Sequence, residues 1–487
     1  MLFNSYEFIF LFLPLTFFLY FYLLNRRLVT GAKGLLVFSS LFFYSWWNIA
    51  YLPLILASML FNYVIGNSLN ENFQKAKVNK KSLLTFGIIS NVTLLGYFKY
   101  SDFFIENFNL AFNGSVPLLH LALPLAISFF TFQQIAYLVD SYRGETKEYD
   151  FLNYALFVTF FPQLIAGPIV HHSEMMPQFA SKWNLVKNYK NIATGLFIFS
   201  VGLFKKVVIA DSFAVWATNG FDVAETLNFL EAWATSLSYT FQLYFDFSGY
   251  TDMAIGAALL FNIKLPVNFN SPYKATSIQD FWRRWHITLS RFLKDYIYIP
   301  LGGNRKDSLK TSTNLMATFI FGGIWHGAGW TFIFWGFLHG VALVINHLWK
   351  SFGFKLPALL SWFITFNFIN IAWIFFRAKE WSDALKVLEG MAGLSFIVIP
   401  SKYEVYLPSL VNINGIFFGE VTQHIGDGSR VLNWIIAGFL VILLFRNSSE
   451  QMRLFKADVS NLLLNIAFLF VALSLVSTAS EFLYFNF

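Results

Sequence analysis

One histidine stands in an apolar, glycine-rich segment where an ionisable side chain is unusual. His326 lies in the run FGGIWHGAGWTFIFWGFLHG, Phe321–Gly340, with glycines on both sides. An ionisable residue at membrane depth is a functional candidate by default. An imidazole can take a proton from a hydroxyl near neutral pH, and small neighbours leave room for a substrate beside the ring. The alternative is a neutral histidine that only forms hydrogen bonds between helices.

The other histidines carry weaker signals. His339 and His347 are eight residues apart on one apolar run, and we expect packing or interfacial roles for both. His424 has no informative neighbours. No pair of histidines has the HExxH spacing of a zinc site, so no metal is expected.

A basic, aromatic segment, Asp280–Gly303, is the second candidate. It reads as an amphipathic interfacial helix whose tryptophans Trp282 and Trp285 lie at headgroup level, with basic side chains facing anionic lipid. The functional alternative is a polyanionic ligand from the cytosol, because arginine pairs with phosphate bidentately. The candidate phosphate-binding residues are Arg283, Arg284, Arg291 and Lys294.

A third polar cluster surrounds Asp246 and Asp252 in the segment YTFQLYFDFSGYTDMAIG. We expect these carboxylates to end an otherwise apolar helix. Asp246 could orient a histidine or an arginine by a hydrogen bond. The alternative is a helix-end network that satisfies interrupted backbone groups.

The chain ends in EFLYFNF, residues 481–487, which contains the phenol of Tyr484. The structural interpretation is an aromatic anchor at the membrane interface. The chemical interpretation is that the phenol of Tyr484 accepts an acyl group. The chain has no cysteine, so a covalent acyl carrier would have to be an oxygen or nitrogen nucleophile.

Composition decides the class of protein that must position these residues. Of the 487 residues, 56% are hydrophobic, 13% are charged and 62 are phenylalanine, whereas soluble domains carry about 25% charged residues. Soluble globular and disordered chains are therefore excluded, and the long apolar runs exclude a transmembrane barrel. The sequence predicts an all-α polytopic membrane protein with roughly 11 to 14 membrane-embedded helices.

Some of the apolar runs are shorter than a full span, so tilted, re-entrant or broken helices are expected among them. The apolar runs, long and short, include Leu118–Val139, Phe151–Val170, Ile192–Ala210, Leu230–Phe247, Leu315–Phe334 and Trp335–Leu348. Residues 390–430 are expected to form interfacial helices and loops.

Loop charge predicts the orientation of these helices. Lys264–Lys310 holds nine basic and three acidic residues, a net charge of +6, so we expect it on the cytoplasmic side. The first apolar run precedes Arg26 and Arg27, which predicts an uncleaved first helix with its N-terminus outside. The last helix then runs outward, so both termini lie outside. The net charge of +7 reflects such loops rather than nucleic-acid binding.

Together the motifs resemble the membrane-bound O-acyltransferase (MBOAT) family, in its bacterial alginate and peptidoglycan O-acetyltransferase branch. The matching stretches are SYTFQLYFDFSGYTDMAIG, PVNFNSPYKATSIQDFWRRWHITLSRFLKDYIYIPLGGNR and FGGIWHGAGWTFIFWGFLHG, within residues 160–347, with MLFNSYEFIFLFLPL and EFLYFNF at the ends. The resemblance implies one integral-membrane domain over residues 1–487, with its helices around a central funnel or tunnel.

The resemblance also assigns roles to residues. The buried catalytic histidine of the family corresponds to His326, and its second polar motif residue corresponds to His286 in WHITLS. Tyr484 corresponds, less directly, to a tyrosine that carries the acyl group in related export systems. Trp325 flanks the expected chemistry. His286 or nearby backbone amides would stabilise the oxyanion.

The implied donor is acetyl-coenzyme A, a substrate and not a resident cofactor. It carries about four negative charges, which the +6 segment would attract. The implied setting is the bacterial inner membrane, with membrane lipid and an extracytoplasmic esterase-like acetyltransferase as partners. The acceptor stays open: alginate, peptidoglycan or a similar polysaccharide.

Three alternatives remain at this point. A transporter or flippase would explain the helices and the intramembrane histidine, but it predicts internal repeats, which the sequence does not show. A member of the same family that acylates a lipid or a protein would differ in the length of the cavity beside His326. A structural scaffold would not need the dense polar and glycine motifs.

Overall fold

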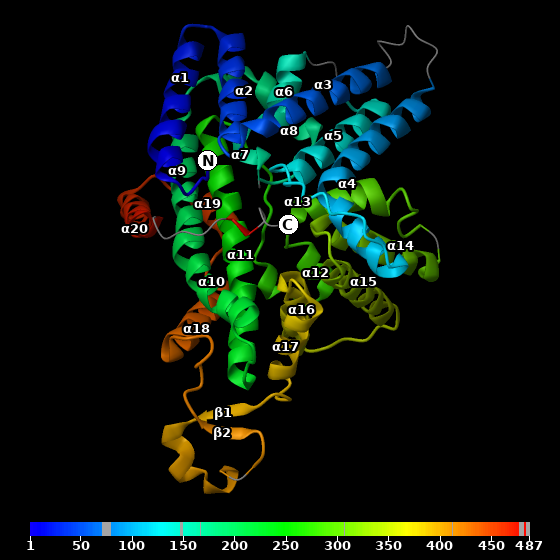
Figure 1. Ribbon diagram of the computed structural model, residues 1–487. Coiled ribbons are helices and arrows are strands. Elements are labelled where there is room, and N and C mark those ends of the chain that lie inside the picture. The colour runs from blue at the N-terminus through cyan, green and yellow to red at the C-terminus, as the bar shows by residue number, and fades with distance from the viewer. Residues whose placement is uncertain are drawn as a thin grey trace. The chain divides into compact units, whose positions relative to one another are not determined.

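The computed structural model describes residues 1–70, 79–146, 150–165, 167–305, 307–411, 413–476 and 482–483. Helices make up most of this part of the chain (Figure 1). The chain forms two compact units and crosses between them more than once. Unit 1 comprises Met1–Phe204, Tyr250–Val267 and Met452–Phe487, and unit 2 comprises Lys205–Gly249 and Asn268–Gln451.

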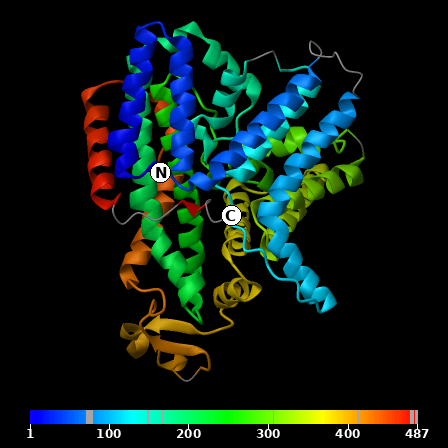
Figure 2. The same ribbon diagram turned by 45° about the horizontal axis from the view of Figure 1, so that its top comes forward.

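Unit 1 is built from helices that surround an aromatic core. Its helices are α1 (Leu13–Asn25), α2 (Val29–Ser45), α3 (Leu52–Leu69), α4 (Lys80–Phe112), α5 (Ile127–Tyr142), α6 (Phe151–Thr159), α7 (Phe161–Leu164), α8 (His172–Ala180), α9 (Tyr189–Phe204) and α20 (Val459–Leu475). A short turn joins α1 to α2, and the two lie side by side in both views (Figure 2). Phe3, Phe8 and Phe43 are fully buried against one another.

Unit 2 holds the segments with the candidate chemistry. Its elements are α10 (Asp211–Thr218), α12 (Ile278–Trp282), α13 (Ile287–Leu293), α14 (Ser308–His326), α15 (Trp330–Ser351), α16 (Ala358–Arg377), α17 (Trp381–Met391), β1 (Ile397–Pro400), β2 (Ile416–Gly419) and α18 (Gly428–Leu444). Two helices, α11 (Phe229–Leu260) and α19 (Ser448–Leu454), extend across the unit boundary.

Five helices among the described residues are long and apolar enough to cross a membrane. They are Glu7–Asn25, Ile49–Leu69, Tyr189–Val223, Trp330–Ser351 and Ala358–Arg377, and the bent pair α18 and α19 would make a sixth. Some of the other predicted runs form shorter helices, and others lie in long helices that do not meet this test of length and apolarity, such as α4 and α11. Among the described residues, fewer helices therefore meet the test for a full span than the 11 to 14 embedded helices expected from the sequence.

Proline and glycine explain where predicted runs break. The run Leu118–Val139 becomes helical only at Ile127, after Pro117 and Pro124, because proline lacks the N–H that a helix interior needs. The run Leu315–Phe334 was expected to be continuous, but α14 ends at His326. Gly327 and Gly329 adopt extended backbone there, so His326 closes a helix instead of lying inside one.

Two further segments differ from the expectation. Residues 390–430 contain the expected loops and short helices, Ser401–Tyr406 and Pro408–Leu410, but β1 and β2 also pair in parallel there, with Ile397 opposite Ile416. Asp246 was expected at a helix end, but α11 continues to Leu260. The carboxylate is therefore mid-helix, where its own charge must be compensated.

The α14–α15 contact is the closest helix packing in unit 2. A Cβ built on Gly323 would lie 3.1 Å from the Cα of Gly336, and a Cβ on Gly336 would lie equally close to Gly323. Neither Cβ could be added without moving backbone. Small residues allow such contact between membrane helices, where lipid gives no hydrophobic drive to association.

Gly336→Ala should therefore destabilise the protein, by about 1 to 3 kcal/mol if it behaves as core overpacking does. The measurement is the thermal midpoint of the detergent-solubilised protein. Gly322→Ala is the matched control, since its Cβ would meet Leu293 at an ordinary 3.5 Å. Equal midpoints for the two variants would contradict the proposed packing.

Candidate active site

His326 lies at the C-terminal end of α14 inside an aromatic enclosure. The residue is 4% exposed. Its ring centroid is 4.8 Å from that of Trp325, 5.0 Å from that of Trp335 and 5.0 Å from that of Phe376. We call these three rings with His326 the aromatic chamber. Because α14 and α15 touch at Gly323 and Gly336, the histidine and Trp335 are brought together from opposite sides of the break.

His286 occupies a strained position between α12 and α13. It is fully buried, and its φ of 41° is left-handed, a conformation that residues with a Cβ rarely adopt. Such strain persists where the surroundings enforce it, often at functional sites. The segment was expected to be one interfacial helix. Instead Trp282 and Trp285 are 7% and 1% exposed, so neither is a headgroup anchor.

Asn268 fixes the tautomer of His286. The Oδ1 atom of Asn268 accepts the backbone N–H of Thr288 at 3.2 Å and its hydroxyl at 2.9 Å, which identifies that atom as the oxygen. His286 Nδ1 lies 3.1 Å from the same oxygen and must therefore donate. Burial lowers the pKa of His286 to about 3, so the ring is neutral and its Nε2 is an acceptor.

Trp325 connects the two histidines within unit 2. Its ring is 6.5 Å from that of His286 and 4.8 Å from that of His326. Phe247 of α11 packs edge-on against His286 at 4.8 Å. The structure thus places His326, His286 and Trp325 in one cluster.

His339 packs against the aromatic chamber, which agrees with the packing or interfacial role expected of it from the sequence. It is fully buried on α15, and its Nδ1 accepts the indole N–H of Trp282 at 3.1 Å. Its ring is 4.7 Å from that of Trp335. The only sequence signal was its position in the same glycine-rich run, three turns after the break.

The predicted phosphate-binding residues are not part of the chamber. Arg283 and Lys294 are exposed, and Arg291 is half-buried. Arg284 Nε pairs with the Asp280 carboxylate at 2.9 Å. They lie at or near the surface of unit 2, which suits a soluble anion but supplies no contact to the reacting group.

Asp246 pairs with a lysine that the sequence reading missed. Lys206 Nζ lies 2.8 Å from Asp246 and 2.7 Å from Asp211, and the lysine side chain is 1% exposed. Lys206 belongs to a π-helical turn, Lys205–Ala210, and such turns are frequent at functional sites. The expected partner of Asp246 was a histidine or an arginine. A lysine forty residues away leaves no local pattern in the sequence.

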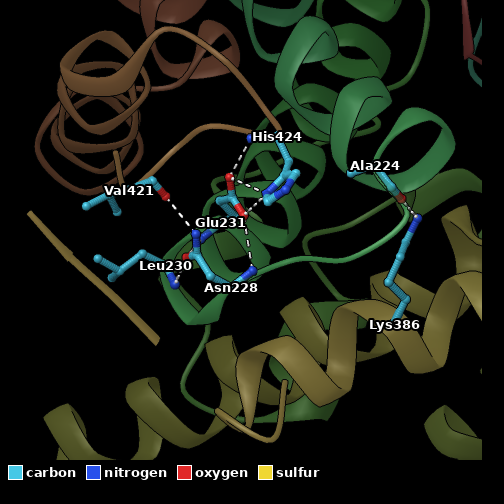
Figure 3. A network of polar contacts seen from close by, with 7 residues as sticks. All are labelled: Ala224, Asn228, Leu230, Glu231, Lys386, Val421 and His424. Atoms are coloured by element: carbon cyan, nitrogen blue, oxygen red, sulfur yellow. Dashed lines mark hydrogen bonds and ion pairs between the residues drawn. The ribbon is translucent and has the colours of Figure 1, made fainter. Parts of the chain in front are cut away.

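A second polar network stabilises the start of α11 (Figure 3). The fully buried Glu231 accepts the backbone N–H of His424 at 2.7 Å, His424 Nδ1 at 2.9 Å and the backbone N–H of Asn228 at 3.1 Å. Lys386 donates to the carbonyl oxygen of Ala224 at 2.6 Å. The contacts of Glu231 connect the segment between β2 and α18 to α11. They also give a structural role to His424, for which the sequence showed no informative neighbours. Within the described part of the chain, no group of three or more His, Asp and Glu could hold a metal ion.

The remaining candidate, Tyr484, lies outside the described residues. Its role as an acyl carrier stays a prediction.

Comparison with known proteins decides the family. The sequence model of the membrane-bound O-acyltransferase family matches residues 10–377. The chain belongs to the MBOAT family. It is therefore a membrane O-acyltransferase, and the transporter and scaffold alternatives no longer apply.

Named MBOAT relatives cover most of the chain. A peptidoglycan O-acetyltransferase of Helicobacter pylori is 52% identical over 100% of this chain and 98% of its own length. A probable alginate O-acetylase of Pseudomonas aeruginosa is 37% identical over 94% of this chain and 84% of its own. A teichoic acid D-alanyltransferase of Streptococcus thermophilus is 29% identical over 54% of this chain and 70% of its own.

Lys206→Met should destabilise this MBOAT protein strongly, because it leaves two carboxylates near each other without their cation. Breaking a buried ion pair from one side costs about 3 to 5 kcal/mol. Lys205→Met is the matched control, since it makes the same substitution at the neighbouring lysine, which donates to the Ser448 hydroxyl at 2.8 Å. The thermal midpoint in detergent checks this, and a Lys206→Met midpoint no lower than that of the control would contradict it.

Proposed function

We propose that this chain transfers an acetyl group from acetyl-coenzyme A towards hydroxyl groups of an extracytoplasmic polysaccharide, and that the polysaccharide is peptidoglycan. The observation that carries the proposal is the buried His326 in its aromatic chamber, within a chain that a peptidoglycan O-acetyltransferase matches from end to end. The alginate O-acetylase relatives support the same reaction on a different polymer. Acetylation of an alginate-like polymer is the second candidate.

His326 acts as the general base in this proposal. It takes the proton of an attacking hydroxyl while the oxygen bonds to the thioester carbonyl carbon. The tetrahedral intermediate then expels the coenzyme A thiolate, which receives the proton from the imidazolium. Such catalysis contributes about 10²- to 10⁴-fold in rate. The rings around His326 exclude water, which would otherwise hydrolyse the thioester.

His286 supports the reaction as a neutral imidazole. Its Nδ1–H is held by Asn268, so Nε2 can accept a proton or a hydrogen bond from the attacking group. A neutral acceptor orients a hydroxyl without placing a second charge in the site.

Basic residues at or near the surface recruit the donor. Arg283 and Lys294 are exposed and Arg291 is half-buried, and the positive field of these residues raises the local concentration of a tetra-anionic substrate. The proposal places this surface on the cytoplasmic side of a bacterial inner membrane, with both termini outside.

The acceptor side of the proposal uses a relay. The phenol of Tyr484 attacks the thioester, carries the acetyl group as an ester, and passes it to an extracytoplasmic esterase-like acetyltransferase that finishes the reaction on the polymer. Each transfer replaces one carbonyl–heteroatom bond by another and needs no further reactant.

His326→Ala should abolish acetyl transfer from radiolabelled acetyl-coenzyme A by the purified protein in lipid vesicles, with a loss of at least about 10²-fold. His347→Ala is the matched control: this histidine is on α15, at the surface, near the Ser308 hydroxyl. Both variants should insert and elute as the parent protein does. Parent-level turnover in His326→Ala would remove this residue from the mechanism.

Tyr484→Phe tests the relay, since it deletes the hydroxyl and keeps the aromatic ring. We expect the labelled acetyl group no longer to reach the polymer in cells that carry this variant. Tyr406→Phe, at a tyrosine 78% exposed, should leave polymer acetylation unchanged. Wild-type acetylation in Tyr484→Phe would show that the acetyl group travels without this phenol.

A further inference from the structure

Trp335 carries a buried donor that the fold does not use. The residue is 1% exposed. Its indole nitrogen is fully covered and has no hydrogen-bond partner among the described residues. Buried indole N–H groups usually find an acceptor, because an unmade hydrogen bond in an apolar interior is costly. An orphan donor of this kind requires an explanation.

The position of the orphan donor is the second observation. The ring of Trp335 lies 5.0 Å from that of His326, nearly perpendicular to it. Any acyl group that meets a nucleophile activated by His326 therefore reacts within reach of this indole. A thioester carbonyl oxygen is an acceptor, and it becomes a much stronger one when it turns into an oxyanion.

The indole is held so that it cannot turn away. Trp373 stacks on Trp335 with ring centroids 5.8 Å apart and 14° between planes. His339 lies at 4.7 Å, and Trp282 closes another side at 5.9 Å. Donors that stabilise a transition state need this rigidity, since they must not reorganise during the reaction.

His286 was a candidate for stabilising the oxyanion, but it is unsuited to that role. Its Nδ1–H is committed to Asn268 and the ring is neutral, so Nε2 has no proton to donate. The rival donors include the indole N–H of Trp325, whose ring lies 4.8 Å from that of His326, and the backbone N–H groups at the start of α15, next to the glycine break.

We propose that the indole N–H of Trp335 donates a hydrogen bond to the thioester carbonyl oxygen of the acyl donor and stabilises the oxyanion formed there. The attacking hydroxyl oxygen bonds to the carbonyl carbon, its proton passes to His326, and the former carbonyl oxygen takes the negative charge facing Trp335. When the carbonyl re-forms, the thiolate leaves with the proton from His326. This inference rests on the proposed function.

The first test removes the donor and keeps an aromatic ring. Trp335→Phe should lower kcat for acetyl transfer by about 10²- to 10³-fold, as loss of one oxyanion donor does, with KM for acetyl-coenzyme A nearly unchanged. Trp216→Phe is the matched control, because it deletes another buried indole N–H without a hydrogen-bond partner, outside the aromatic chamber, and it should keep most of the parent kcat. An equal fall of kcat in Trp216→Phe, or parent-like kcat in Trp335→Phe, would overturn the assignment.

The second test separates the N–H from the shape of the ring. Benzothienylalanine at position 335 puts sulfur where indole has its N–H and leaves the backbone donors of α15 intact. The proposal predicts the same fall in kcat with an unchanged thermal midpoint, whereas a packing role predicts parent-like kcat. Parent-like kcat in this variant overturns the inference. Absence of acetyl transfer in the unaltered protein would instead overturn the proposed function.

Discussion

The contact between Gly323 and Gly336 is the constraint on which the site depends. Side chains at these positions would hold α14 and α15 apart. Their absence lets two helices meet at backbone distance, three residues before His326 and one residue after Trp335. The extended glycines of the break then allow the chain to reverse into α15. The aromatic chamber follows from this geometry, because rings carried by both helices and by α16 must fill the space beside the crossing.

Buried polar groups impose the second constraint. In an apolar surround each charge needs a partner and each N–H an acceptor. In unit 2, Lys206 pairs with two carboxylates. Glu231 accepts hydrogen bonds from two backbone N–H groups and from an imidazole. Unit 1 pairs the amides of Asn62 and Asn91 reciprocally. Other buried donors among the described residues, such as the indole N–H of Trp216, also lack a hydrogen-bond partner, so it is its place beside His326 that distinguishes the indole N–H of Trp335.

Part of this arrangement could be predicted from the sequence. Composition predicted a helical membrane protein, and the structure confirms it, because apolar runs leave signals within one segment. The motifs indicated His326, His286 and Trp325, which the structure brings together, and the roles of these residues stay predictions. The +6 segment was also identified, although its tryptophans proved to be core residues rather than interfacial anchors.

The rest depends on contacts between distant segments, which leave no periodic pattern. Lys206 and Asp246 are forty residues apart, and Glu231 and His424 are farther apart still. The parallel pairing of β1 with β2 likewise joins two strands of four residues each, which are too short to show a clear alternation of apolar and polar residues. The break after His326 was missed because the apolar pattern continues across it. Trp335 was read as the start of a new run, whereas it lies one turn inside α15.

The most direct test of the account is a structure of the protein bound to acetonyl-coenzyme A, an unreactive analogue in which a methylene separates the sulfur from the carbonyl. The account predicts that the carbonyl group lies in the aromatic chamber beside His326, with its oxygen about 3 Å from the indole nitrogen of Trp335. An acyl end bound elsewhere in the protein, with His326 still enclosed by its aromatic neighbours, would contradict it.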